Sequence, residues 1–274
     1  MARHTSTVTS ALFTESLAPL RADPSGSAVL LDIDGTLAPI VAHAADAHVP
    51  ETTRQLMIAV SRRYRLLACI SGRRASEARA MVSIGTIAYL GSHGAELLQS
   101  GWTEAQIDPA LLQWAPRIDD FRRETDTPEL RRRRVRIEDK GPIIAYHWRG
   151  AADEQDARAA TDAIASQARE AGLEVHWGRK VMEVRPPVRI DKGLGVRTVL
   201  GDREYSAALY AGDDVTDLDA FRALRELVHD GVIEHAVCVG VRSEDGPPEI
   251  EEEADVLVDG TDGIRELLAA LAAD

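Results

Sequence analysis

Short apolar runs alternate with longer amphipathic stretches over residues 28–96 and again from residue 192 onward. Such runs are typical of strands buried on both faces, and the stretches between them have helical spacing. The expected strands are Ala28 to Ile33, Leu66 to Ile70, Thr86 to Leu90, Ala207 to Ala211, Ala236 to Val241 and a short one near Val256. The expected helices are Ser10 to Leu20, Pro50 to Tyr64, Ala75 to Val82, Lys192 to Leu200, one that ends at Val228 and one from Asp262. This rhythm predicts a doubly wound parallel sheet with helices on both faces.

The rhythm changes between residues 103 and 186. A helix from Pro109 to Arg123 precedes "RVRIE" and "IIAYHW", whose alternation around the turn "DKGP" predicts an antiparallel hairpin. The remaining elements expected in this segment are a helix, Ala152 to Ala171, and two strands, Leu173 to Trp177 and Lys180 to Arg185, that turn at Gly178. We therefore expect residues 103–186 to form an inserted α+β cap domain. Residues 1–102 and 187–274 would form one Rossmann-like core.

Composition and charge narrow the range of functions. The 274 residues are 45% hydrophobic, which is enough for one large domain or two smaller ones. The formal net charge of −13 argues against nucleic acid or an anionic membrane as partner. Cys69 and Cys238 lie in apolar runs, so we interpret them as buried free thiols. With residues 1–9 read as a disordered leader and no signal peptide or membrane span expected, we predict a cytoplasmic protein.

Polar clusters follow three of the expected strands. They are "DIDGT" after the first strand, "SGR" after the second and "GDDVTD" after Ala211. In an open parallel sheet, ligands bind beyond the carboxyl ends of the strands, so these clusters are expected to line one crevice. Residues two apart on a strand share a face. The carboxylates of Asp32 and Asp34 are therefore predicted to converge, while Ile33 points away.

Several carboxylates in one crevice repel each other unless a cation lies among them. Asp213 and Asp214 would add carboxylates from a different strand. Mg²⁺ fits such a set because it prefers oxygen ligands and keeps waters and phosphate oxygens in its shell. Backbone amides, Thr36, Ser71 and Lys192 would supply donors for a phosphate. The pattern predicts metal-assisted phosphoryl transfer, in which one carboxylate attacks phosphorus and a second protonates the departing alkoxide.

Four motifs, "DIDGTLAPI", "SGR", Lys192 and "GDDVTD", occur in the order and at the spacing of the haloacid dehalogenase superfamily, which the chain resembles over about residues 28–270. Within it, "GSHGAE", "KGPIIAYHWR", "KVMEVRP" and "GDDVTDLDAF" resemble the trehalose-6-phosphate phosphatases. The resemblance implies a Mg²⁺-dependent phosphatase acting on trehalose 6-phosphate. There is one departure, since the family usually has Glu where this chain has Leu218.

The resemblance also implies a role for each matching residue of the core. Asp32 matches the nucleophile that becomes an aspartyl phosphate, and Asp34 matches the general acid and base. The positions that match magnesium ligands are Asp32, the backbone carbonyl of Asp34 and Asp213, with Asp214 and Asp217 as support. The positions that match phosphate-holding residues are Ser71 and Lys192. The further candidate substrate-binding residues of the core are Thr36, Gly72, Arg73 and His93.

In the expected cap, Glu183 with Lys180, Arg185 and His147 matches the positions that grip sugar hydroxyls. Strand alternation puts Glu183 and Arg185 on one face and Lys180 on the opposite face unless the strand bulges. Glu183 is therefore the expected principal hydroxyl acceptor, with Arg185 beside it.

Simpler interpretations compete at several positions. His93 is a poor metal ligand beside hard oxygen donors, and we favour a structural imidazole over a substrate-facing one. Asp214 could bind the metal, orient its loop or cap a helix. The run Arg131 to Arg134 is interpreted as solvated charge at a hairpin edge. Packing of the small domain explains most of the tryptophans in or beside it, which are Trp102, Trp114, Trp148 and Trp177.

Two alternatives to trehalose 6-phosphate hydrolysis remain. The same chemistry could act on sucrose phosphate, mannosylglycerate phosphate or a trehalose-like pseudodisaccharide phosphate. The second alternative, from another functional class, is a catalytically idle sugar-phosphate sensor. The sequence argues against it because it retains the full set of Asp32, Asp34, Lys192 and Asp213. In every case the expected partner is a small-molecule sugar phosphate, and we expect a monomer.

Overall fold

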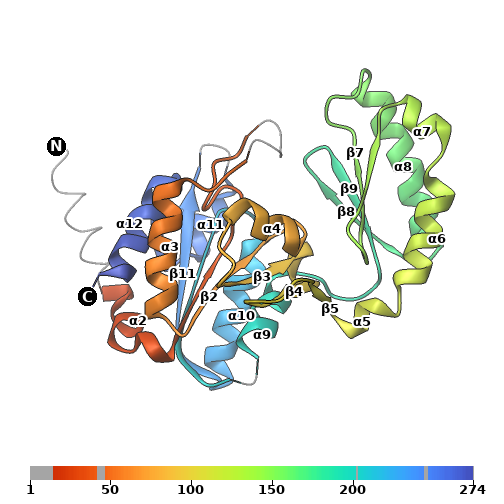
Figure 1. Ribbon diagram of the computed structural model, residues 1–274. Helices are drawn as coiled ribbons and strands as arrows, with labels where there is room; N and C mark the ends of the chain where they lie inside the picture. Colours follow the sequence, from red (N-terminus) through yellow and green to blue (C-terminus); the bar gives the residue numbers. More distant parts are fainter. Residues whose placement is uncertain (1–14, 42–46, 202, 244–245, 274) are drawn as a thin grey trace. The chain divides into compact units, whose positions relative to one another are not determined.

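The computed structural model divides the chain into two compact units (Figure 1). It describes residues 15–41, 47–201, 203–243 and 246–273. One unit, the core, comprises Met1–Gln106 with Ile190–Asp274, and the other, the insert, is Ile107–Arg189. These boundaries fall a few residues beyond the expected bounds of 103 and 186.

The core unit is built on a sheet whose strand order is β12-β11-β10-β1-β2-β3-β4-β5. The strands are β1 (Ser27–Leu31), β2 (Leu66–Ile70), β3 (Ala88–Gly91), β4 (Glu96–Leu98), β5 (Gln106–Ile107), β10 (Tyr205–Gly212), β11 (Ile233–Arg242) and β12 (Val256–Asp259). The pairings from β12 to β3 are parallel, and β4 pairs antiparallel with β3. The predicted parallel sheet is confirmed, while β4 was not foreseen because three residues give too little pattern.

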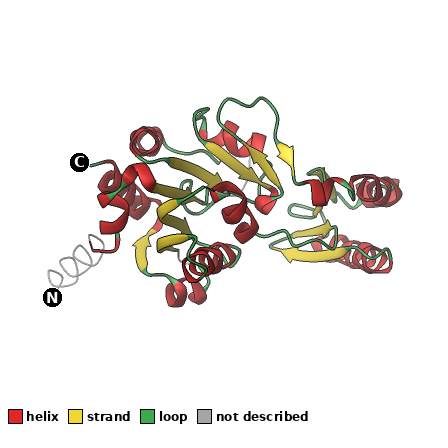
Figure 2. Ribbon diagram, turned by 90° about the horizontal axis from the view of Figure 1, so that it is seen from below, coloured by secondary structure: helices red, strands yellow, loops and turns green. Residues whose placement is uncertain are grey.

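Helices cover both faces of this sheet (Figure 2). They are α2 (Ala18–Ala22), α3 (Glu51–Arg63), α4 (Ala75–Val82), α9 (Lys192–Leu200), α10 (Asp217–His229), α11 (Pro248–Glu253) and α12 (Gly260–Ala272), with 3-10 turns η1 (Pro24–Gly26) and η3 (Ser92–Gly94). One apolar cluster joins α2, α3, α4 and α12 to one face, and a second joins α9, α10 and α11 to the other. Alternate strand residues serve each face: Val29 packs in the first cluster and Leu30 in the second. Such two-sided burial explains the wholly apolar strands.

Most predicted core elements lie within two or three residues of their expected bounds. Strand β2 and helices α4 and α9 have the expected bounds. Strand β1 ends at Leu31, two residues before the expected end, so both aspartates of "DIDGT" lie beyond it. Residues 10–14 of the expected helix Ser10 to Leu20 and the whole expected leader lie outside the described residues, and α2 occupies Ala18–Ala22. No helix among the described residues is long and apolar enough to cross a membrane.

The insert has its own four-stranded antiparallel sheet in the order β6-β7-β9-β8. Its strands are β6 (Arg136–Asp139), β7 (Ile144–His147), β8 (Glu174–Gly178) and β9 (Val181–Arg185), and its helices are α5 (Pro109–Leu112), α6 (Ala115–Thr125), α7 (Pro128–Arg132) and α8 (Glu154–Glu170). A separate apolar cluster fills this unit, and it includes Tyr146 and Met182. The expected hairpin is β6–β7.

One helix prediction in the insert was wrong. The expected helix from Pro109 to Arg123 is two helices, α5 and α6, that meet at Trp114. The sequence reason is Pro116, which lies in the first turn of α6. Proline has no N–H to continue a helix and favours the first turn of a new one.

Candidate active site

The carboxyl ends of β1 and β10 bring two of the predicted aspartates together. Asp32 follows β1, and its backbone N–H donates to the carbonyl of Ala211 at 2.9 Å, which extends the pairing of the two strands. Asp213 follows β10. Both side chains are buried, with Asp32 4% and Asp213 5% exposed. One carboxylate oxygen each of Asp32, Asp213 and Asp217 lies within 4.8 Å of the others.

Lys192 neutralises part of this acidic cluster. Its ammonium Nζ lies 2.7 Å from Oδ1 of Asp32 and 2.6 Å from Oδ1 of Asp217. The lysine is the first residue of α9, a helix whose N-terminus is capped by the Asp191 side chain. Burial opposes its charge, but Asp217 and Asp32 raise the pKa of Lys192 well above its ordinary value. Lys192 is therefore a fixed cation beside Asp32.

Asp217 supports the cluster through hydrogen bonds on both of its oxygens. Its Oδ1 accepts from Lys192 and from the Tyr210 hydroxyl at 2.6 Å. Its Oδ2 accepts from the backbone N–H groups of Asp213 and Asp214 at 3.0 and 2.9 Å. With four donors on two oxygens, Asp217 is suited to hold Lys192 and the 213–214 backbone in place rather than to bind a metal directly.

Gly35 and Thr36 pack closely around Asp213. Thr36 donates its hydroxyl to Oδ1 of Asp213 at 3.2 Å. Gly35 has φ of +91°, and a Cβ there would lie 2.1 Å from Oδ2 of Asp213. Only glycine fits both the left-handed backbone and this approach. The neighbouring Asp214 is exposed, accepts from the N–H of Val215 and is outside the acidic cluster.

Burial dominates the electrostatics of the cluster. It raises the pKa of Asp32 well above its ordinary value, with Lys192 opposing the shift and Asp217 and Asp213 adding to it. Burial likewise raises the pKa of Asp213 to about 7, and the charge of Asp217 adds to the shift. A further cation bound among these carboxylates would favour their charged forms.

The donor set fits Mg²⁺. Asp32 and Asp213 offer carboxylate oxygens that lie close to one another, while the oxygens of Asp217 are occupied by four donors. Mg²⁺ is usually held by one or two carboxylates, with waters and phosphate oxygens completing its shell. Asp32 and Asp213 are therefore the side chains that would hold it. The predicted use of the Asp34 carbonyl stays a prediction.

The carboxylate of Asp34 is not one of the three that form the acidic cluster, and its predicted convergence with Asp32 stays a prediction. Its carboxylate is bound in two-pronged fashion by Arg73, with Nε at 2.7 Å from Oδ2 and Nη2 at 2.6 Å from Oδ1. Because β1 ends at Leu31, the chain has left strand geometry before Asp34. Asp34 instead forms an isolated bridge with Ala38.

The loop after β2 carries Ser71, Gly72 and Arg73. Ser71 is buried, and its Oγ accepts from the N–H of Arg73 at 3.2 Å. His93 lies against this loop: a Cβ on Gly72 would be 2.8 Å from Cε1 of the imidazole. His93 has φ of +58°, and its N–H donates to the carbonyl of Ser71 at 3.0 Å. These contacts tie His93 to the loop after β2, and the choice between a structural and a substrate-facing imidazole stays a prediction.

In the insert, the sugar-binding candidates Glu183 and Arg185 lie side by side on β9. Arg185 donates to Oε2 of Glu183 from Nε at 3.1 Å and from Nη2 at 2.5 Å. Lys140, which the sequence analysis missed, donates to Oε1 of Glu183 at 3.0 Å. All three residues are 8% exposed. We call these three residues the insert ion cluster.

The other two sugar-binding candidates, His147 and Lys180, bind acidic residues outside the insert ion cluster. His147 is joined to Glu138, also missed, by a 2.7 Å contact between Nε2 and Oε2. This hydrogen bond lowers the pKa of Glu138 to about 2, with the charge of Lys140 contributing. Lys180 is not on β9: it has φ of +63° in the turn before it, and its Nζ binds Glu154 at 2.8 Å. Glu138 and Lys140 could have been found, since "IEDK" places them two apart in the predicted hairpin.

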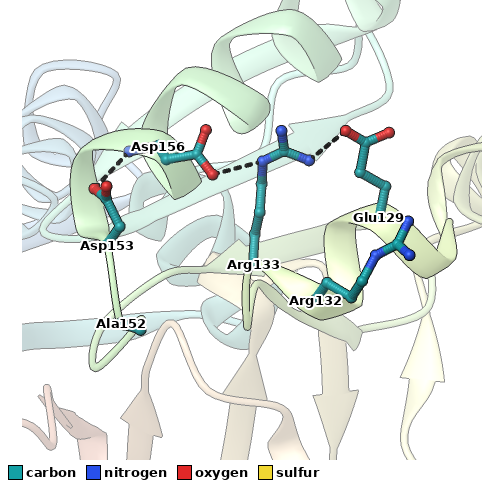
Figure 3. Close-up of a pocket in the computed structure, with 6 residues that line it drawn as sticks. All are labelled: Glu129, Arg132, Arg133, Ala152, Asp153 and Asp156. Carbon is teal, nitrogen blue, oxygen red and sulfur yellow. Dashed lines mark hydrogen bonds and ion pairs between the residues drawn. The ribbon is translucent and has the colours of Figure 1, made fainter.

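Three side chains of the basic run Arg131 to Arg134 are exposed, as the solvated interpretation expected, but the run lies at the end of α7 rather than on a hairpin edge, and two of its members form ion pairs. Arg131 and Arg132 end α7, and Arg131 binds Asp126 at 2.6 Å. Arg133 binds Glu129 of α7 at 2.7 Å and Asp156 of α8 at 2.8 Å, so it links the two helices. These residues line a pocket (Figure 3). The residues that line this pocket include none of the candidate site residues.

The parallel sheet with its inserted α+β unit has the fold class of a haloacid dehalogenase-like hydrolase from Bacteroides thetaiotaomicron, which is 14% identical with a TM-score of 0.61 over 89% of this chain. Within that class, the model of the trehalose-phosphatase family matches residues 30–251. The chain belongs to this family.

Named relatives agree with this membership. The trehalose-phosphate phosphatase of Mycobacterium avium (strain 104) is 35% identical over 214 residues, which cover 72% of this chain and 51% of that protein. The probable trehalose-phosphate phosphatase 4 of Oryza sativa subsp. japonica is 28% identical over 205 residues, which cover 72% of this chain and 55% of that protein. The chain thus spans about half the length of these curated relatives.

Solved structures agree with the fold. A trehalose-6-phosphate phosphatase related protein is 25% identical with a TM-score of 0.66, and the match covers 89% of this chain and 96% of that one. The C-terminal domain of the C. albicans trehalose-6-phosphate phosphatase is 22% identical with a TM-score of 0.71, and the match covers 96% of each chain.

The departure at Leu218 falls in the core rather than among the polar groups of the site. Leu218 is 3% exposed and belongs to the apolar cluster that α9, α10 and α11 form on the sheet. Its neighbour Asp217 keeps all four hydrogen bonds described above. A leucine here therefore removes no donor or acceptor from that network.

Proposed function

We propose that this chain is a Mg²⁺-dependent phosphatase that hydrolyses trehalose 6-phosphate to trehalose and phosphate. The observation that carries the proposal is the buried carboxylate of Asp32, paired with Lys192 and adjacent to Asp213, in a chain of the trehalose-phosphatase family. Bound Mg²⁺ would offset the charge of the phosphate and of the carboxylates.

In the proposed reaction, Asp32 attacks phosphorus and forms an aspartyl phosphate as the sugar alkoxide leaves. Water then attacks the phosphorus of this intermediate and regenerates Asp32. Lys192, 2.7 Å from Asp32, keeps the nucleophile oriented and supplies positive charge to the phosphate. The hydroxyl of Ser71 and the guanidinium of Arg73 are the further donors proposed for the phosphate oxygens.

Asp34 is proposed to protonate the departing alkoxide and then to take a proton from the attacking water. In the structure its two oxygens are both engaged by Arg73. Asp34 must therefore exchange this pair for a proton and a hydrogen bond to the leaving oxygen during each turnover.

The direct test is phosphate release from a panel of sugar phosphates, with and without a chelator. We expect trehalose 6-phosphate to be the best substrate and the chelator to abolish turnover. A preference for sucrose phosphate, mannosylglycerate phosphate or a pseudodisaccharide phosphate would keep the chemistry and correct the substrate. Absence of turnover on every phosphoester, including an aryl phosphate, would favour the sensor alternative.

Substitution of Asp34 by Asn should separate its proton-transfer role from a structural one. We expect Asp34→Asn to lower kcat on trehalose 6-phosphate by about 10²- to 10⁴-fold, since the alkoxide needs a proton. The loss with p-nitrophenyl phosphate should be much smaller, because nitrophenolate leaves unprotonated. Equal losses on both substrates would contradict the general-acid assignment.

Substitution of Glu183 should affect the sugar but not the phosphoryl chemistry. We expect Glu183→Gln to lower kcat/KM for trehalose 6-phosphate by roughly ten- to a thousandfold, as hydrogen bonds to a charged group are lost. Hydrolysis of p-nitrophenyl phosphate should barely change. The Gln variant is preferable to Ala because it keeps an acceptor for Lys140 and Arg185 in this buried cluster.

Glu174→Gln provides a matched control in the same sheet. Because Glu174 is exposed on β8 and its carboxylate contacts His176, we expect this variant to hydrolyse both substrates as the unchanged protein does. If Glu174→Gln instead loses activity on trehalose 6-phosphate alone, the assignment of specificity to Glu183 and its neighbours would need revision.

A further inference from the structure

Glu96, the last residue of "GSHGAE", has a buried carboxylate that the proposed reaction does not use. The residue is 2% exposed and opens β4 opposite Gly91, the last residue of β3. A carboxylate removed from water is costly unless donors surround it. The contacts of its two oxygens therefore indicate what the residue does.

The carboxylate of Glu96 binds the beginning of α4. Its Oε2 accepts from the N–H of Ala75, the first residue of that helix, at 2.9 Å. Its Oε1 accepts from the hydroxyl of Ser92 at 3.3 Å and lies 3.5 Å from Nε of Arg74. Arg74, the N-cap residue, makes no side-chain cap bond, and Glu96 accepts from the N–H of Ala75, one of the four N–H groups at the helix start that have no intrahelical partner. A negative charge there also interacts favourably with the helix dipole.

Gly91 makes this arrangement possible. A Cβ on Gly91 would lie 2.0 Å from the backbone nitrogen of Ala75. The end of β3 and the beginning of α4 can therefore touch only if residue 91 has no side chain. Glu96 is paired with Gly91 across the β3–β4 ladder, which aims its carboxylate at the same point.

The helix start that Glu96 holds is the end of the loop carrying Ser71 and Arg73. The rest of that loop is tied to the segment around Ser92. The Ser71 N–H donates to Leu90 at 2.9 Å, and the Ser92 N–H donates to the carbonyl of Arg73 at 2.7 Å. The loop is thus fixed by backbone bonds over residues 71–73 and by the Glu96 carboxylate at Ala75.

We propose that Glu96 is a positioning residue for the phosphate-binding loop. By holding the Ala75 N–H and the Ser92 hydroxyl, it keeps the side chains of Ser71 and Arg73 in the arrangement that receives a phosphate group. It touches neither the substrate nor the acidic cluster. This inference rests on the proposed function, since it assumes that the loop binds phosphate.

Two conservative variants of Glu96 separate the effect of side-chain length from the effect of its negative charge. Glu96→Gln keeps a carbonyl oxygen within reach of the Ala75 N–H, whereas Glu96→Asp keeps the charge but is one methylene too short. Inorganic phosphate, titrated calorimetrically in the presence of Mg²⁺, is the probe. We expect Glu96→Asp to weaken phosphate binding about tenfold and Glu96→Gln to stay within about threefold of the unchanged protein. With p-nitrophenyl phosphate, Glu96→Asp should raise KM more than it lowers kcat, because the loop binds ground and transition states alike.

Hydrogen exchange at the Ala75 amide reports on its hydrogen bond to Glu96 and does not require phosphate. The amide should exchange faster in Glu96→Asp and remain protected in Glu96→Gln. A matched control is Asp255→Ala, which removes another carboxylate that accepts from a backbone amide, Cys238 N–H at 2.7 Å. It should lower thermal stability and leave phosphate affinity unchanged.

Three outcomes would overturn the proposal: normal phosphate affinity in Glu96→Asp, an equal loss in Glu96→Gln, or an equal loss in Asp255→Ala. If the unchanged protein neither binds phosphate nor hydrolyses a phosphoester, the proposed function fails. Exchange at the Ala75 amide then still decides whether Glu96 holds the start of α4. Unaltered exchange in Glu96→Asp would show that it does not.

Discussion

Replacement of Asp32 by Asn is expected to lower turnover by at least roughly 10⁴-fold, the scale of loss when a nucleophile is removed. The amide has nearly the same shape but is a poor nucleophile. The fold should survive, because Lys192 keeps its contact with Asp217 when Asp32 loses its charge. Steady-state kinetics on trehalose 6-phosphate and thermal unfolding measure the two effects separately.

Trapping identifies the attacked residue directly. Quenching the unchanged enzyme during turnover and reducing it with borohydride should convert Asp32 to homoserine, which mass spectrometry of the peptide detects. Asp219→Asn is the matched control, since its carboxylate binds Arg222 on α10 at 3.2 Å and is not part of the acidic cluster. Substantial residual turnover in Asp32→Asn, or homoserine at another aspartate, would contradict the nucleophile assignment.

Removal of the Asp213 carboxylate should have the second large effect, on Mg²⁺. We expect Asp213→Ala to raise the half-saturating Mg²⁺ concentration by two orders of magnitude or more, since such sites use only one or two protein carboxylates. Calorimetric titration of Mg²⁺ gives a readout apart from activity. Asp214→Ala is a stringent control, because the adjacent exposed carboxylate is outside the cluster and should change Mg²⁺ binding far less.

The pH dependence of Mg²⁺ binding provides a further check on the same site. The pKa of Asp213 is raised to about 7 in the metal-free protein. Below that pH the carboxyl holds a proton that Mg²⁺ must displace, so the half-saturating concentration should rise as pH falls through 7. A half-saturating concentration that is constant between pH 8 and 6 would argue that Asp213 is not a ligand.

The core could be predicted from the sequence because its pattern is local and strong. Strand β2 and helices α4 and α9 were delimited correctly from aliphatic runs and helical spacing alone. The joining of Asp32 to Asp213 also followed, since adjacent parallel strands end at the same edge of the sheet. In the insert, by contrast, one proline was enough to divide a helix that the apolar pattern continued.

The sequence by itself determined the fold class, the order of the motifs and the identity of the acids at the strand ends. Only the tertiary structure decided which donor each carboxylate meets: Asp34 binds Arg73, Glu183 binds Lys140, and Glu96 binds the start of α4. The physical reason is range. Hydrophobic periodicity indicates which face of an element is buried. These three hydrogen bonds join residues 21 to 43 positions apart in the chain. They depend on where strands end and where side chains point, and both are determined only when the elements pack.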